Sequence, residues 1–76
     1  MTPDQIRAAR VSLNLTQAQL GALLETDGQT VRRMEGDPSH STFRKPAVRM
    51  VRLIRAYLDG YRPADWPVQK TMDVVE

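Results

Sequence analysis

Apolar side chains recur at helical spacing in four stretches of this 76-residue chain, and polar or breaker residues separate the stretches. The pattern predicts helices that open near residues 2, 16, 27 and 46 and end near residues 14, 25, 36 and 60. A proline-flanked stretch at 62–67 is long enough for only a single turn. No stretch alternates as a β-strand does. We therefore expect an all-α fold, a compact four- to five-helix bundle forming one domain over 1–67, with a disordered or interface-forming tail at 68–76.

Local signals support these helix boundaries. The sequences Thr-Pro-Asp-Gln at 2–5 and Thr-Gln-Ala-Gln at 16–19 both have the form of a capping box. Asn14 suits the left-handed conformation that ends many helices. Asp27 is the expected cap of the third helix, and Pro46 suits the first turn of the fourth.

Residues 15–35 carry the most informative pattern in the chain. They predict a short amphipathic helix, a tight turn and a second short helix. The apolar positions of this segment are Leu20, Leu23, Leu24, Val31 and Met34. Two short helices held across a turn form a helix-turn-helix, whose second helix enters the major groove of DNA.

Basic residues are concentrated in one part of the chain. The segment 28–62 holds eight bases and three acids, which makes it +5, while the rest of the chain is −3 and the whole is +2. The eight bases are Arg32, Arg33, Arg44, Lys45, Arg49, Arg52, Arg55 and Arg62. Such a segment beside a candidate recognition helix favours a polyanionic partner, although arginines on helices are often simply solvated.

The segment 10–36 resembles the Xre/Cro/C1 family of helix-turn-helix proteins, typified by the lambdoid phage repressors and Cro. The matching positions are Leu13, Leu15, Thr16, Gln17, Leu20, Thr30, Val31, Met34, Glu35 and Gly36. The resemblance implies a lambda repressor-like DNA-binding domain. The sequence Asp-Gly-Tyr-Arg-Pro at 59–63 is also similar, over five residues, to anti-CRISPR-associated repressors.

The resemblance implies how the third helix would read DNA. Gln29 and Arg33 lie four residues apart and share a helix face, and Gln bonds adenine while Arg bonds guanine. Arg32 is expected at the edge of this face, where it contacts a base or a phosphate. Gly28 matches a base-contacting position but departs from the polar residue usual there, as Asp27 departs from its neighbour.

Other family positions would contact the DNA backbone or support the fold. The expected phosphate contacts are Gln17, Thr16, Thr30, Arg44, Lys45 and Arg49. Gln17 begins the second helix, where free N–H groups and the helix dipole favour an anion. Arg10 and Glu35 match a structural ion pair that would join the first and third helices.

The fourth helix has apolar residues on two sides. Val48, Val51, Ile54 and Leu58 form a stripe that we expect to face the core. A second stripe, with the aromatic residue just beyond it, is expected to form a dimer interface and consists of Met50, Leu53, Tyr57 and Trp66. The alternative is that the first helix and the turn around residue 66 fold back and cover both sides.

These observations together favour a cytoplasmic, sequence-specific regulator that binds double-stranded DNA as a homodimeric repressor of its own operon or of a phage or mobile-element operon. Its operator would be an inverted repeat. The alternatives are an antitoxin whose tail binds a toxin, and a protein-interaction module that does not bind DNA. We expect no enzyme, cofactor, metal site or small-molecule ligand, because the chain has no cysteine, no phosphate loop and one histidine, His40, without a partner. It also has no apolar run long enough to span a membrane.

Overall fold

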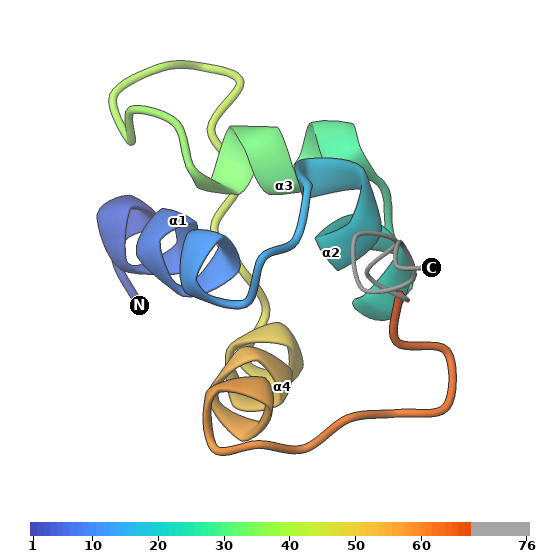
Figure 1. The fold of residues 1–76 in the computed structure, drawn as a ribbon. Coiled ribbons are helices and arrows are strands. Elements are labelled where there is room, and N and C mark those ends of the chain that lie inside the picture. The colour runs from blue at the N-terminus through green and yellow to red at the C-terminus, as the bar shows by residue number, and fades with distance from the viewer. Residues whose placement is uncertain (68–76) are drawn as a thin grey trace.

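The computed structural model describes residues 1–67, and the tail expected at 68–76 lies outside the described residues. The described part contains four helices and no strand: α1 (Pro3–Ser12), α2 (Gln17–Leu23), α3 (Gly28–Met34) and α4 (Val48–Leu58). Figure 1 shows α3 lying across α2, with α1 beside them and α4 on the opposite side of the core. The predicted all-helical fold is confirmed. No helix in this part of the chain is long and apolar enough to cross a membrane.

The helix starts follow the local signals, with one exception. Both capping boxes are formed: Thr2 and Thr16 each accept the backbone N–H three residues later, at 3.1 and 3.0 Å. Asp27 caps α3 by accepting the N–H of Thr30 at 2.8 Å. The fourth helix begins two residues later than Pro46, after Ala47, whose side chain makes no capping hydrogen bond.

Three helix ends share one geometry. The residue after the C-cap of α1, α2 and α4 is Asn14, Glu25 and Gly60, with φ of 61°, 63° and 110°. In each case the following N–H reaches back to a carbonyl in the last turn, as in Thr26 to Gly21 at 2.8 Å. Asn14 is left-handed as predicted. The same conformation at Glu25 was not foreseen, because glutamate has no side-chain feature that favours it.

The core is built from all four helices. Its buried residues are Ile6, Ala9, Leu15, Leu20, Leu23, Leu24, Val31, Met34, Ile54 and Tyr57. The apolar positions predicted for the segment 15–35 are therefore all inside the fold. Val11 of α1 is apolar but lies outside the core, with 61% of its surface exposed.

The two stripes of α4 do not divide between core and surface as we predicted. Tyr57 is only 2% exposed, and Met50 and Leu53 pack against the core beside Ile54. Val48, in contrast, is 68% exposed and Leu58 is 46% exposed. Each stripe thus contributes one fully buried residue, Ile54 from the predicted core stripe and Tyr57 from the predicted interface stripe.

The segment after α4 explains why Tyr57 is buried. The chain folds back so that the Trp66 ring meets the Tyr57 ring edge-on, with centroids 5.1 Å apart. Arg62 lies 4.2 Å above the centre of the Trp66 ring and donates to the carbonyl of Tyr57 at 2.8 Å. Burial raises the pKa of the Tyr57 hydroxyl. Assigning Tyr57 to a dimer interface is therefore wrong, because the chain covers this residue itself, and Trp66 packs against the core in the same way.

Candidate nucleic-acid interface

Two glycines let α2 and α3 approach closely. A Cβ added at Gly21 would lie 2.4 Å from the backbone carbon of Asp27, which is too close for any side chain. A Cβ added at Gly28 would lie 3.0 Å from the Cα of Ala18. Position 28 therefore faces α2, and a side chain there would not point to the outer face of α3. The glycine there serves helix packing, and the expected base contact at Gly28 stays a prediction that only its backbone could fulfil.

A partly buried polar cluster fixes α3 relative to α1. Arg10 Nε donates to Glu35 Oε2 at 2.6 Å, and Arg10 Nη2 donates to Glu35 Oε1 at 3.1 Å. The two side chains are only 15% and 5% exposed. Arg10 also donates to the Leu15 carbonyl at 3.1 Å. The ion pair expected from the resemblance is thus present in bidentate form, the geometry in which an arginine–carboxylate pair is most directional.

Gln17 belongs to this cluster. Its Nε2 donates to Glu35 Oε1 at 3.1 Å, so the side chain links α2 to the end of α3. The amide nitrogen carries a second N–H, so this bond leaves the phosphate contact expected from the sequence as a prediction. Thr16 is exposed beside it, with its hydroxyl oxygen accepting the N–H of Gln19 as the helix cap.

The start of α3 carries a negative charge held among positive ones. The pKa of the Asp27 carboxyl lies below its ordinary value, first because the Thr30 N–H and then its hydroxyl donate to it, and to a smaller extent because Arg33 and Arg44 are near. The hydroxyl of Thr30, expected to contact phosphate, is therefore directed toward Asp27. The carboxylate is therefore near enough to both guanidinium groups to be stabilised by their charge.

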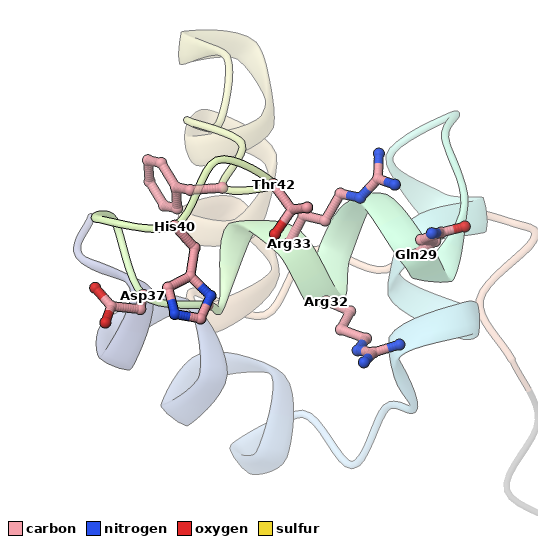
Figure 2. Close-up of a pocket in the computed structure, with 8 residues that line it drawn as sticks. Gln29, Arg32, Arg33, Asp37, His40 and Thr42 are labelled. Atoms are coloured by element: carbon pink, nitrogen blue, oxygen red, sulfur yellow. The ribbon is translucent and has the colours of Figure 1, made fainter.

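The outer face of α3 forms one wall of a polar hollow. Gln29 and Arg32 are exposed and Arg33 is half-exposed, and Figure 2 shows Arg32 and Arg33 leaving the helix in different directions. The hollow has a volume of about 270 Å³. Its lining residues are Gln29, Arg32, Arg33, Gly36, Asp37, His40, Thr42 and Phe43.

The loop over 37–43 supplies the other wall. Thr42 lies beside Arg33, and His40 projects from the same loop (Figure 2). The loop begins with an internal turn in which the Asp37 carboxylate accepts the N–H of Ser39 at 2.9 Å. Sequence reasoning treated this stretch only as a loop. No residue pattern in it signals a site, because the contribution comes from its position beside α3.

The basic residues that follow the loop lie in different places. The Arg44 N–H donates to the Arg33 carbonyl at 3.4 Å, which brings the chain back to the end of α3. Lys45 instead lines a different hollow together with Met1 and Val48. Arg49 is exposed in the first turn of α4. Of the three expected backbone contacts, only Arg44 is brought to the hollow side of α3.

Comparisons with models of protein families, with curated proteins and with solved structures found no match to this chain.

Proposed function

We propose that the protein is a sequence-specific regulator that binds double-stranded DNA, with α2, the turn at residues 24–27 and α3 acting as a helix-turn-helix of the Xre/Cro/C1 type. The observation that carries the proposal is the polar outer face of α3. This face presents Gln29, Arg32 and Arg33 beside Arg44. The helix is held in place by the partly buried ion pair of Arg10 with Glu35 and by the close approach of α2 at Gly21. Preformed, rigid display of such side chains is what base reading requires.

The residues divide into two roles in this proposal. Arg33 and Gln29 read base edges in the major groove, with Arg33 directed at guanine and Gln29 at adenine. Arg32 and Arg44 contact the flanking phosphates, and the loop at 37–43 lies along the same backbone. Asp27, kept ionised by its cap, disfavours any approach that would place a phosphate against it.

The regulator acts as a homodimeric repressor in this proposal. Two recognition helices related by a two-fold axis would read an inverted repeat with half-sites about 10–10.5 base pairs apart. Occupying a promoter is the simplest action open to a domain of this size, and an autoregulated phage or mobile-element operon is the expected target. The dimer also offsets the thin core of a small domain.

The test is a selection of binding sites from random duplex DNA, followed by anisotropy titrations at several salt concentrations. Arg33→Ala should weaken binding to the selected site by about 1–3 kcal/mol and relax the preference at one base pair. Arg44→Ala should weaken binding to all sequences alike and reduce the salt slope by about one.

Arg7→Ala is the matched control, because Arg7 is an exposed arginine on α1 and does not line the hollow. It should leave both the affinity and the sequence preference unchanged. If the wild type selects no sequence, or if Arg33→Ala keeps the full preference, base reading by α3 is refuted.

A further inference from the structure

An apolar groove between α1 and α4 is left uncovered by the described chain. Two hollows of about 470 and 260 Å³ meet at Met1, which lines both of them. The first also contains Ala8 and Leu58, and the second contains Val48 and Val51. We call this surface the α1–α4 groove. The groove lies along the side of α4 that faces away from the core. It includes Val48 and Leu58, which are large apolar residues with exposed side chains.

The groove has a basic rim. Arg55 lines the larger hollow and Lys45 lines the smaller one, and no aspartate or glutamate lines either of them among the described residues. Three arginines and no acid occur along α4 itself. Direct pairing of this face with the same face of a second copy would bring the arginines together, and like charges in an interface are unfavourable. The groove therefore suits an occupant that is apolar and acidic.

The chain contains one such segment. Residues 72–76 read Met-Asp-Val-Val-Glu, with three apolar residues, two acids and no base. Five residues reach up to about 16 Å in an extended chain. The groove runs beside α4 from its start to Leu58, about 15 Å for ten residues at the rise of a helix. The segment 72–76 thus matches the α1–α4 groove in length, in charge and in hydrophobicity.

The path of the described chain favours a groove on another molecule. After α4 the chain runs to the side on which α2 lies, away from α1 (Figure 1). The contact between Trp66 and Tyr57 holds it on the core side of α4. The groove opens on the other side of the same helix. We propose that residues 72–76 of each copy bind the α1–α4 groove of a second copy, so that two chains exchange tails in a symmetric dimer.

Such an exchange gives the chain a dimer interface that does not use the buried face of α4. It pairs Asp73 and Glu76 with Arg55 and Lys45 around a core of valines and methionines. Because both tails bind, the contact occurs twice in each dimer. The inference does not depend on DNA binding, and it is tested without DNA.

The first experiment measures the dimer dissociation constant of the full chain by analytical ultracentrifugation. Val74→Asp and Leu58→Asp should each raise this constant by about tenfold or more, since each places an unpaired carboxylate in an apolar contact. Val11→Asp is the matched control, because Val11 is also an exposed apolar residue (61%, against 46% for Leu58) but lies outside the groove, and it should have no effect. Circular dichroism checks the fold of Leu58→Asp, while Val74→Asp changes only the tail.

The second experiment tests the charge pairing. Arg55→Glu should weaken the dimer, and adding Glu76→Arg to it should restore at least part of the lost affinity. Isotope-filtered NMR on a mixture of labelled and unlabelled protein should then show contacts between Val74 and Leu58 of different chains.

Three results would overturn the proposal. The wild type could be monomeric at several hundred micromolar. Leu58→Asp could abolish a dimer that Val74→Asp leaves intact, which would indicate face-to-face pairing instead. The filtered NMR experiment could place the tail in the groove of its own chain.

Discussion

The α2–α3 pair and α4 differ in how their apolar residues find partners. In the pair, the apolar positions Leu20, Val31 and Met34 are buried as their spacing predicts. In α4 the spacing predicts Ile54 correctly, but Val48 is exposed and Tyr57 is buried, against the prediction.

The difference lies in where the partners come from. The two short helices contact each other across a four-residue turn, and Gly21 permits only one close arrangement. The partners of α4 lie outside the helix: α1 is remote in sequence, and the segment 61–66 follows α4 without regular structure. A helix with two apolar sides can be buried on either of them, and only those partners select the side.

The largest expected effect tests which side of α4 is buried, by comparing Tyr57 with Val48. Tyr57→Ala should lower the free energy of unfolding by about 3–5 kcal/mol, because it empties a site that is filled by a buried ring in edge-on contact with Trp66. Val48→Ala should change it by less than about 0.5 kcal/mol, since Val48 is 68% exposed. Urea denaturation followed by circular dichroism measures both. Comparable losses in the two variants would restore the original assignment of the stripes.

The next effect concerns the ion pair that joins α1 to the α2–α3 pair. Arg10→Met should cost about 3 kcal/mol, because it leaves the Glu35 carboxylate, which is 5% exposed, without its cation. Glu35→Gln should cost less, because Arg10 is more exposed and keeps its bond to the Leu15 carbonyl. Thermal melts rank the two variants. Unchanged midpoints in both would mean that the pair contributes nothing to stability.

A smaller effect tests the close approach within the pair itself. Gly21→Ala should destabilise the fold by about 2 kcal/mol, since the new methyl group meets the backbone of Asp27 and the gain in helix propensity is only about 1 kcal/mol. Gly36→Ala is the control: its Cβ would lie 3.4 Å from the nearest atom, so this variant should be neutral or slightly stabilising. Equal stability of the two variants would show that α2 and α3 separate at little cost.

The smallest expected effect is a gain in stability. Glu25→Asn should raise the free energy of unfolding by about 0.5–1 kcal/mol, because asparagine tolerates the left-handed conformation that residue 25 adopts at φ 63°. Glu25→Gln separates charge from conformation: it removes the charge, keeps the shape and should leave stability unchanged. A gain in the glutamine variant equal to that in the asparagine variant would assign the effect to charge.

Much of the fold follows from local chemistry that can be read along the chain. Thr2 and Thr16 cap their helices because the hydroxyl and the glutamine three residues later satisfy free N–H groups within one turn. Asp27 and Asn14 act in the same local way. These interactions involve residues three or four positions apart, so no other part of the chain has to be known.

The candidate site could be predicted only in part. Gln29 and Arg33 lie on the outer face of α3, because helical spacing alone places them there. The second wall of the hollow, formed by His40 and Thr42, depends on how a loop without regular structure folds beside α3. Gln17 is the intermediate case: the sequence places it at the start of α2, and only the structure directs its amide to Glu35.

The sequence by itself determined which segments are helices, where most of them begin and end, and which residues lie on the polar face of α3. Each of these follows from interactions within one or two turns. The tertiary structure alone decided which side of α4 is buried, where Lys45 lies and that Trp66 covers Tyr57. These outcomes depend on competition for the same apolar surface between segments that belong to different elements, and the favoured arrangement buries the most surface without leaving a polar group unpaired.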